Sequence, residues 1–400
     1  PLIEKNMKRK IQSLTYFTSA VLVLPGAAEV IYSNLQDISI PANYDGVFLN
    51  VETGAWNNDT LNPVTGWDLN PFFGGSVLWN APSFQPVRSG TGSTDTVLNL
   101  ATGTTVDSSS VISTFVQGAG GDNVGGAGYG GSEGHVGTTF TAGTEGYIGF
   151  QLNGDKYGYM RVVFTNNTGG ALIKEWAYEN TSNAAIAVGN VKRTGSDVML
   201  DSTYGNFSVS SVVTDAIGTT NVVKTGSGTT ILSGSSTYTG TTTVSAGTLL
   251  VTGALGSVGT GTGAVSVSSG ASLGGTGEIF GSVTFDGGSY LAIQNIADPL
   301  KITGSVTFGS GFGIDNLTGI DWDSLALDTP YTLISDTSTT FSASNIDNFG
   351  LANKFAVGSL GNFAYFQNGS LAVVVVPEPS TALLSASGLL ALALRRRRSS

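Results

Sequence analysis

A glycine-centred motif occurs four times in the second half of this 400-residue chain. Each copy reads apolar-x-x-Gly-x-x-apolar, and the copies are Val244/Gly247/Leu250, Val267/Gly270/Leu273, Phe285/Gly288/Leu291 and Phe308/Gly311/Ile314. Their glycines are 23, 18 and 23 residues apart, and a residue on the same strand face stands two positions before each copy: Thr242, Val265, Val283 and Val306. A strand, a glycine turn and a second strand, repeating about every 20 residues, predict the coils of a parallel β-helix. Glycine permits the φ > 0 corner of each coil.

Composition favours β-structure over the rest of the chain as well. Only 11% of the residues are charged, whereas glycine alone contributes 57 residues, and β-branched and aromatic residues are frequent enough to build a core. The chain has no cysteine and one histidine, His135. It must therefore be held together by its core and its sheet hydrogen bonds. Cysteine-based zinc sites, cysteine nucleophiles and paired-histidine metal sites are excluded.

Between residues 30 and 191, short apolar stretches alternate with turns rich in Gly, Asn, Asp and Pro. The pattern predicts an antiparallel β-sandwich of jelly-roll kind, with strands at 47–51, 76–79, 96–100, 147–152, 159–164, 171–178 and 184–188. The expected domains are the sandwich over 29–191, a linker over 192–203, the β-helix over 204–320 and a cap over 321–376. A cap is needed because the last coil of a solenoid otherwise leaves its core and strand edge open.

The first 28 residues have the three-part pattern of a secretory signal peptide. Lys8, Arg9 and Lys10 precede a weakly apolar stretch at 14–24, and small residues follow up to Ala28. We therefore expect a signal peptide over residues 1–28, with translation starting at Met7.

Residues 377–400 have a second three-part pattern. Pro377, Glu378 and Pro379 bar a regular helix or strand. The apolar run that follows, 382–394, predicts a single C-terminal hydrophobic helix. Roughly 14 residues span only ~21 Å of a ~30 Å bilayer core, so this marginal anchor suits a transient association with the inner membrane. The pattern ends in four residues that do not readily cross a membrane: Arg395, Arg396, Arg397 and Arg398.

In this order, the three parts resemble the PEP-CTERM sorting signal of exported bacterial proteins. The resemblance implies that an exosortase-type membrane protease recognises Pro377, Glu378 and Pro379, and that the four arginines act as a membrane stop. It also implies delivery to the cell surface or extracellular matrix, and an association with exopolysaccharide or biofilm.

Two stretches of the repeat region resemble autotransporter-associated β-strand repeats. They are residues 224–234, Lys-Thr-Gly-Ser-Gly-Thr-Thr-Ile-Leu-Ser-Gly, and residues 237–251, Thr-Tyr-Thr-Gly-Thr-Thr-Thr-Val-Ser-Ala-Gly-Thr-Leu-Leu-Val. The resemblance implies that the β-helix is right-handed and serves as the stalk of an exported surface protein.

Aromatic residues alternate along the predicted strands of the N-terminal half. They form either a packed sheet face or a platform on which sugars stack; they are Tyr147, Phe150, Tyr157, Tyr159, Trp176 and Tyr178. The glycine-rich segment 117–137 holds His135, which has no second histidine or cysteine beside it in the sequence. We expect this segment to be a solvated loop, because it is too poor in apolar residues to pack.

Two groups of carboxylates are further candidates, each with a structural alternative. Asp321 and Asp323 alternate onto one predicted strand face, where they form an acid–base pair or a Ca²⁺ site, or remain solvated. The second group either ligates calcium through a loop or forms Asx turns; it comprises Asn57, Asn58, Asp59 and Asp68.

The charge balance limits the possible partners. Residues 29–377 hold 26 acidic and nine basic side chains, a net charge of −17, which disfavours nucleic acid and anionic lipid. Polysaccharide lyases and hydrolases need clustered carboxylates, but the acidic residues of the repeats are not in register with the coils: Glu278, Asp286, Asp298 and Asp315. We therefore expect an exported, non-enzymatic protein without a metal or cofactor. The alternatives are a carbohydrate-binding module and a polysaccharide-active β-helix enzyme.

Overall fold

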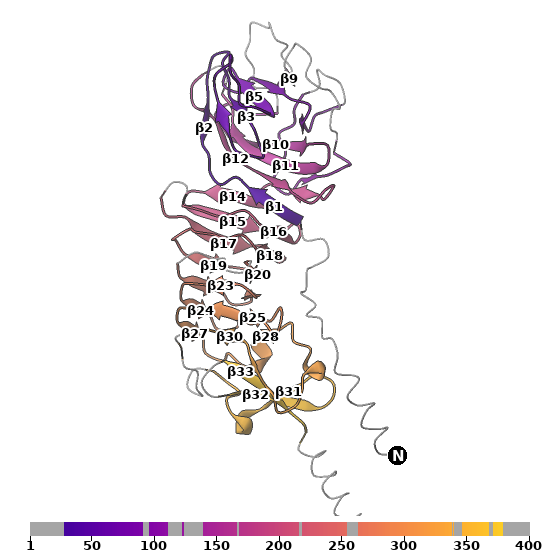
Figure 1. Cartoon of the computed structure of the whole chain (residues 1–400), viewed down its shortest axis with the longest axis vertical. Helices are drawn as coiled ribbons and strands as arrows, with labels where there is room; N and C mark the ends of the chain where they lie inside the picture. The colour runs from indigo at the N-terminus through magenta and orange to yellow at the C-terminus, as the bar shows by residue number, and fades with distance from the viewer. Residues whose placement is uncertain are drawn as a thin grey trace, which may run out of the picture.

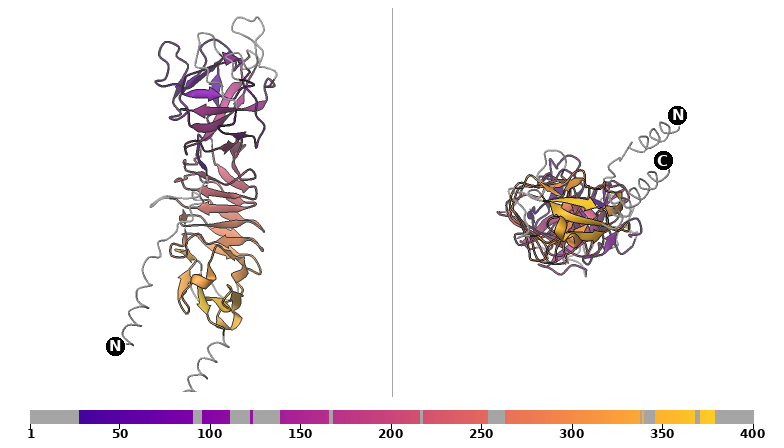
Figure 2. Two further views of the ribbon diagram at one scale, coloured as in Figure 1. Left: turned by 90° about the vertical axis from the view of Figure 1, so that its right-hand side faces the viewer. Right: turned by 90° about the horizontal axis from the view of Figure 1, so that it is seen from below.

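The computed structural model describes residues 28–90, 96–110, 122–123, 139–165, 168–215, 218–253, 263–337, 339, 346–367 and 371–378. Within these ranges the chain is all-β, as predicted, and elongated (Figures 1 and 2). The helices found there are short 3₁₀ turns, Ile314–Asn316, Trp322–Ser324 and Leu351–Asn353, and none is long and apolar enough to cross a membrane. The predicted signal peptide, apart from Ala28, and the predicted C-terminal helix lie outside the described residues.

Parallel strands wind into a β-solenoid of about five turns between residues 197 and 318. The parallel strands of one sheet are β15 (Asp197–Asp201), β17 (Asn221–Thr225), β19 (Thr242–Val244), β21 (Val265–Val267), β24 (Val283–Phe285) and β27 (Val306–Phe308). The solenoid part of the second sheet contains β16 (Phe207–Val209), β18 (Thr229–Leu232), β20 (Thr248–Val251), β22 (Ser272–Gly275), β25 (Tyr290–Ala292) and β28 (Leu317–Thr318). A third, shorter sheet consists of β23 (Glu278–Ile279), β26 (Leu300–Ile302) and β30 (Ile334–Ser335). The predicted stack of parallel coils is confirmed.

The first half of the repeat motif lies in the predicted register. Thr242, Val265, Val283 and Val306 are cross-strand partners in consecutive coils, and so are Val244, Val267, Phe285 and Phe308. All eight side chains are buried. Because strand side chains alternate between faces, each coil contributes two inward residues from this sheet to the core.

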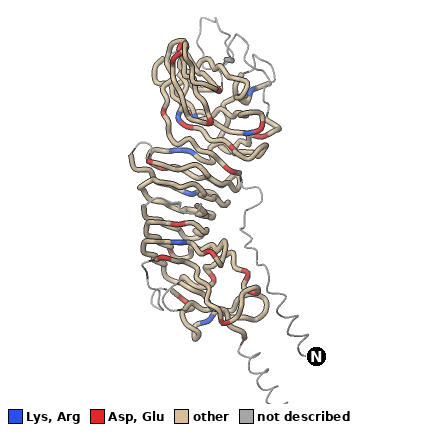
Figure 3. The backbone as a smooth tube through the Cα atoms, viewed as in Figure 1, with Lys and Arg blue, Asp and Glu red and all other residues tan. Residues whose placement is uncertain are grey.

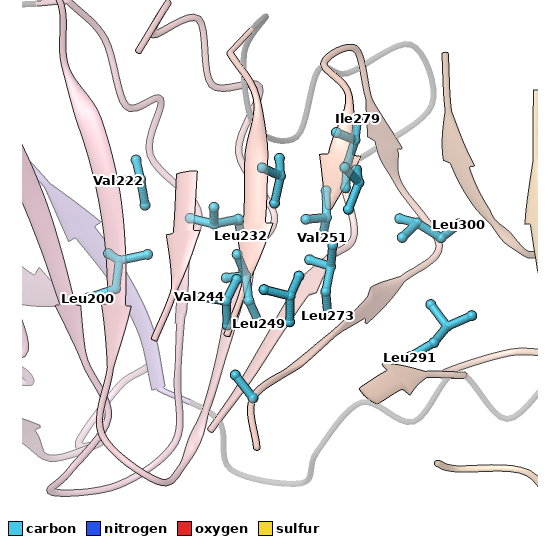
Figure 4. Close-up of a cluster of buried hydrophobic side chains, with 14 of the residues drawn as sticks. Leu200, Val222, Leu232, Val244, Leu249, Val251, Leu273, Ile279, Leu291 and Leu300 are labelled. Carbon is cyan, nitrogen blue, oxygen red and sulfur yellow. The ribbon is translucent and has the colours of Figure 1, made fainter. Parts of the chain in front are cut away.

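The register predicted for the second half of the motif is partly wrong. Leu273 and Leu291 are partners, as predicted, but Leu249 pairs with Leu273 in place of Leu250, and Leu317 pairs with Leu291 in place of Ile314. The reason is that the turns differ in length between coils, so a fixed spacing from the glycine shifts the register. Figure 4 shows Leu249, Leu273 and Leu291 among the buried side chains between the sheets.

The four motif glycines all adopt left-handed backbone conformations, with φ between 64° and 80°. Their surroundings differ, however. A Cβ atom at Gly247 would lie 2.4 Å from the carbonyl oxygens of both Gly226 and Gly228, whereas a Cβ atom at Gly270 would meet nothing within 4 Å. Substitutions at Gly270 and Gly247 can therefore distinguish the effect of backbone strain alone from that of strain combined with steric crowding.

Replacing Gly270 with alanine is expected to lower the free energy of unfolding by about 1 kcal/mol, from backbone strain alone. Gly247→Ala adds overpacking against two carbonyl oxygens and is expected to cost about 3 kcal/mol. Chemical denaturation of both variants checks this; equal losses would mean that the coil corner at Gly247 can relax.

The N-terminal region is built from two antiparallel layers. One layer contains β7 (Phe84–Pro86), β10 (Glu145–Leu152), β11 (Lys156–Val163), β12 (Ala171–Glu179) and β2 (Ile38–Ile40). The other contains β4 (Trp56–Asn57), β3 (Phe48–Leu49), β5 (Leu69–Phe72), β6 (Val77–Asn80) and β9 (Asp122–Asn123). Leu49, Leu69 and Leu78 from the second layer share a core with Met160 and Val162 from the first.

The layer containing β11 is buried on both faces. Met160 and Val162 point into the core between the two layers, whereas Tyr157 and Tyr159, on the opposite face of β11, belong to the same apolar cluster as the solenoid. The strand β1 (Ala28–Tyr32) joins the two regions, since it pairs antiparallel with β12 and parallel with β16. The second solenoid sheet and this layer therefore form one continuous sheet.

Residues 192–203 differ from the predicted linker. They lie largely in β14 (Val191–Thr194) and β15, which pair antiparallel with each other, and β15 begins the solenoid sheet. Val191, Val198 and Leu200 alternate along these strands and are buried in the solenoid core. Polar residues between these apolar positions made the segment look like a linker.

Antiparallel strands follow the last coil. They are β29 (Pro330–Thr332), β33 (Ala372–Val376), β32 (Asn362–Gln367) and β31 (Phe355–Val357), in that spatial order. The free edge of β27 is covered by threonine hydroxyls: Thr339 accepts a hydrogen bond from the Val306 amide at 2.7 Å, and Thr337 donates one to the Gly304 carbonyl at 3.0 Å. These hydrogen bonds satisfy part of this edge, which makes pairing with another chain less favourable.

Candidate functional site

The chain leaves the described fold at the predicted sorting tripeptide. β33 ends at Val376 and is paired on both edges, to β29 on one side and to β32 on the other. All five of its residues are buried. Pro377 is half-buried and Glu378 is exposed. The tripeptide therefore begins directly at the end of a central strand, without a spacer. Pro379, Arg395, Arg396, Arg397 and Arg398 lie outside the described residues, as does His135.

The aromatic residues considered as a sugar-stacking platform do not form an exposed surface. Phe150, Tyr157, Tyr159, Trp176 and Tyr178 are buried, each in one of the two apolar cores. Tyr147 is half-buried against the solenoid core, with its ring centroid 5.9 Å from that of Tyr159. These aromatics are therefore packed sheet faces, because both faces of their layer are covered.

The prediction that Asp321 and Asp323 share a strand face is wrong. Asp321 precedes the 3₁₀ turn Trp322–Ser324, which contains Asp323. The Asp323 carboxylate accepts hydrogen bonds from the Ser359 amide at 2.9 Å and from the Ser359 hydroxyl at 2.6 Å. Hydrogen bonds from the Ser359 hydroxyl, the Ser359 amide and the Leu360 amide lower the pKa of Asp323. Asp323 therefore ties its own turn to the loop that contains Ser359.

The candidate calcium residues behave as loop-stabilising groups. Asp59 accepts hydrogen bonds from the Leu61 amide at 2.9 Å and the Asn62 amide at 3.1 Å, which is an Asx turn. Asp68 is buried and accepts from the Val51 amide and the Ser83 hydroxyl. Among the described residues, no group of three or more His, Asp or Glu side chains is placed to hold a metal ion.

A buried ion pair that the sequence did not reveal lies at the junction of the N-terminal region and the solenoid. Arg161 on β11 and Glu175 on β12 are cross-strand partners, and an Arg161 Nη2–Glu175 Oε1 contact of 2.9 Å joins them. Their side chains are 6% and 0% exposed. Arg161 also donates to Glu145 at 3.0 Å.

Two further groups bind the Glu175 carboxylate. The Tyr32 hydroxyl donates to it at 2.7 Å and the Arg193 amide at 2.8 Å. Burial raises the pKa of Glu175, and Arg161 only partly offsets this. Because Tyr32 lies on β1 and Arg193 on β14, the carboxylate ties four strands together. The available signal was that Arg161 and Glu175 interrupt runs of apolar strand residues.

Lys224 occupies an inward position of the solenoid, between Leu200 and Val244 in adjacent coils. Its ammonium group donates to the carbonyl oxygens of Thr225, Gly226 and Ala246 at 2.7 to 3.0 Å. Burial lowers its pKa to about 8, while the three carbonyl acceptors favour the charged form. The side chain links the turns of two successive coils and is not accessible to a substrate.

Charges are sparse along the solenoid (Figure 3). Glu278 on β23 lies opposite Lys301 on β26, so one acidic residue of the repeats is in register with a base and not with another carboxylate. Near the junction, a hollow of about 60 Å³ is lined by Asn190, Asp201 and Tyr204 among others. Ligand pockets usually measure roughly 300 Å³ or more, so this hollow is too small for a sugar ring.

The pKa directions predict an acidic stability optimum. Burial raises the pKa of Glu175, Glu179 and Asp68 above the values of 4.5 for Glu and 3.8 for Asp in the unfolded chain. Because these carboxyl groups take up protons more readily in the folded state, the free energy of unfolding increases as the pH falls towards those unfolded pKa values. Hydrogen bonds lower the pKa of Asp59, Asp107, Asp215 and Asp323, so their contribution is lost below the unfolded value of 3.8. We expect the melting temperature to peak between about pH 3.8 and 4.5, and a peak at pH 7 or above would contradict this.

Comparisons with known families match two segments. A model described as Passenger-associated-transport-repeat matches residues 222–251, which run from β17 to the end of β20. A model described as PEP-CTERM protein-sorting motif matches residues 375–398, starting inside β33. No curated protein and no solved structure matches the chain. The chain thus carries a passenger-associated-transport repeat within its solenoid and a PEP-CTERM protein-sorting motif after its last described strand.

Proposed function

We propose that this chain is an exported, non-enzymatic protein of the cell surface or extracellular matrix. In this proposal an exosortase-type membrane protease processes the sorting motif after a transient stay at the inner membrane. A β-sandwich is then presented on a right-handed solenoid stalk, in association with exopolysaccharide. The observation that carries the proposal is the position of the motif: it begins where a fully folded β-body ends.

The non-enzymatic role is supported by how the described carboxylates are used. Glu175 is buried against Arg161, Asp59 accepts hydrogen bonds from backbone amides of its own loop, and Asp323 accepts them from Ser359 in a neighbouring loop. A general acid or base must reach a substrate, and these groups are engaged in holding turns and strands.

The test is mass spectrometry of the mature protein from cells that contain the protease. We expect the wild-type chain to lose the segment after the tripeptide and to leave the membrane. Replacing Pro377, Glu378 and Pro379 with alanine is expected to leave a full-size, membrane-held form. The matched control replaces Ser380 and Thr381 with alanine. Unchanged size and release of the tripeptide variant would refute the proposal.

One observation favours carbohydrate binding as a second candidate. Tyr44 is 42% exposed and packs edge-on against Phe72 and Trp79, with centroid distances of 5.3 and 5.6 Å. Leu69 on β5 and Leu78 on β6 point into the core. Phe72 and Trp79 stand at odd spacings from them on the same strands, so they lie on the face of the sheet away from the core. An exposed ring held by other rings suits sugar stacking.

The corresponding test is retention of the chain on a panel of immobilised polysaccharides. If Tyr44 stacks on a sugar, Tyr44→Ala should reduce retention, while Leu61→Ala, at a highly exposed aliphatic position of the same region, should not. Equal retention of the two variants would rule out Tyr44 as the contact.

A further inference from the structure

Exposed large apolar side chains gather around the C-terminal strands. Leu327, Leu351, Phe355 and Leu360 are each at least 40% exposed, and Leu360 reaches 68%. Two of these flank the point where the chain leaves the fold. Leu360 lies in the turn before β32, whose Phe363 pairs with Val376. Leu327 immediately precedes Asp328, whose amide donates to the Val375 carbonyl at 2.7 Å.

The two loops are held against each other. The Asp323 carboxylate, four residues before Leu327, accepts hydrogen bonds from the Ser359 amide at 2.9 Å and from the Leu360 amide at 3.3 Å. A Cβ atom at Gly361 would lie 3.5 Å from a carboxylate oxygen of Glu378. Leu327, Leu360 and Glu378 therefore share one surface, which we call the exit face.

The tether between this face and the apolar run of the motif is short. Ala382 is four positions after Glu378, and at ~3.6 Å per residue this distance is at most about 14 Å. β33 cannot lengthen the tether without breaking its pairing to both β29 and β32. Whatever binds the apolar run of the motif at the membrane is therefore held within about 14 Å of the exit face.

The same pairing limits how a protease can read the chain. Proteases often bind the residues before the cleavage site as an added strand, which requires a free strand edge. Residues 372–376 offer none, because both edges of β33 are already hydrogen-bonded. Recognition on this side of the tripeptide is thus confined to the surface around it.

We propose that the exit face is a docking surface for the membrane protease that processes the sorting motif. This inference rests on the proposed function. Exposed apolar groups rimmed by polar ones are typical of protein–protein contacts, and the acidic rim of Asp328 and Glu378 disfavours anionic lipid headgroups. The partner surface is accordingly an apolar patch edged by basic side chains.

The test measures the rate at which the full chain is cleaved in cells that contain the protease. The double variant Leu327→Ser/Leu360→Ser is expected to be cleaved about tenfold more slowly, because two central contacts are lost. The control is Leu351→Ser, which is 55% exposed but lies beside Phe366, at the other end of β32. Both variants should keep the wild-type melting temperature, since these side chains are exposed.

Two further measurements separate docking from steric obstruction and from lipid binding. A six-residue Gly/Ser insert between Val376 and Pro377 should slow cleavage if the exit face docks, since the face and the tripeptide then no longer bind as one unit. Faster cleavage would show that the folded strands merely obstruct the protease, and would overturn the proposal. So would binding of the mature chain to phosphatidylglycerol vesicles that depends on Leu327 and Leu360.

The proposal and the function on which it rests fail in different ways. Equal cleavage rates for the wild type and the double variant refute the exit face as a docking surface and leave the sorting function intact. A wild-type chain that stays uncleaved refutes both.

Discussion

Replacing Arg161 with methionine is expected to lower the free energy of unfolding by about 3 kcal/mol, because it leaves the buried Glu175 carboxylate without its counter-charge. Glu175 keeps hydrogen bonds from Tyr32 and Arg193, which places the loss at the lower end of the range for broken buried pairs. Chemical denaturation at pH 7 measures it.

Acidification should narrow this deficit. Without Arg161, the pKa of Glu175 rises further above its unfolded value of 4.5. A carboxyl group with a raised folded pKa loses its stabilising contribution as the pH rises through that pKa. The variant should therefore approach the wild type as the pH falls towards 4.5.

The control lies on the same strand. Lys156→Met breaks the more exposed Lys156–Glu52 pair, with side chains 22% and 40% exposed, and should cost less than about 1 kcal/mol. The double variant Arg161→Met/Glu175→Gln removes both charges and should recover part of the loss. A deficit that does not change between pH 7 and 4.5 would show that lost packing, and not the unpaired carboxylate, causes it.

The junction is also where the sequence was least informative. The strand pattern of β10, β11 and β12 was readable, since each overlaps a predicted strand. What could not be read was that the layer is covered on both faces, because alternating aromatics look the same whether they face solvent or a second core. Placing β1 between β12 and β16 requires a contact across about 150 residues, which no local pattern encodes.

The solenoid was more predictable because its information is local and repeated. A glycine with φ > 0 and the inward residues of the preceding strand recur at the same spacing in four coils, so an error in one coil is visible against the others. The residues after the glycine were less certain, since Leu249 and Leu250 are both apolar and only the pairing with Leu273 selects Leu249. The sorting motif could be identified without a structure, because it is defined by the order of residue types along the chain.

Replacing Phe285 with alanine is expected to lower the free energy of unfolding by about 4 kcal/mol. Phe285 is fully buried, and its ring lies 5.0 Å from Phe308 and 5.9 Å from Phe312, while Phe308 and Phe312 stack at 3.9 Å. Removing it leaves a cavity that two neighbouring rings cannot fill without losing their own contacts. Thr284→Ala, at the exposed position next to it on β24, is the matched control and should change stability by less than about 0.5 kcal/mol.

The loss should be local, since the coils of a solenoid are stabilised mainly by their neighbours. The Phe312 carbonyl accepts a hydrogen bond from the Asp347 amide, and the carbonyl of the next residue, Asn348, accepts one from the Phe366 amide of β32. Because β32 pairs with β33, weakening this end of the core also loosens the strand that presents the tripeptide. Hydrogen exchange should therefore rise in β24, β27 and β33 more than in β15 and β17. Exchange that rises equally in all five strands would mean that the chain unfolds as one unit, and that the strand before the sorting motif draws its stability from the whole solenoid.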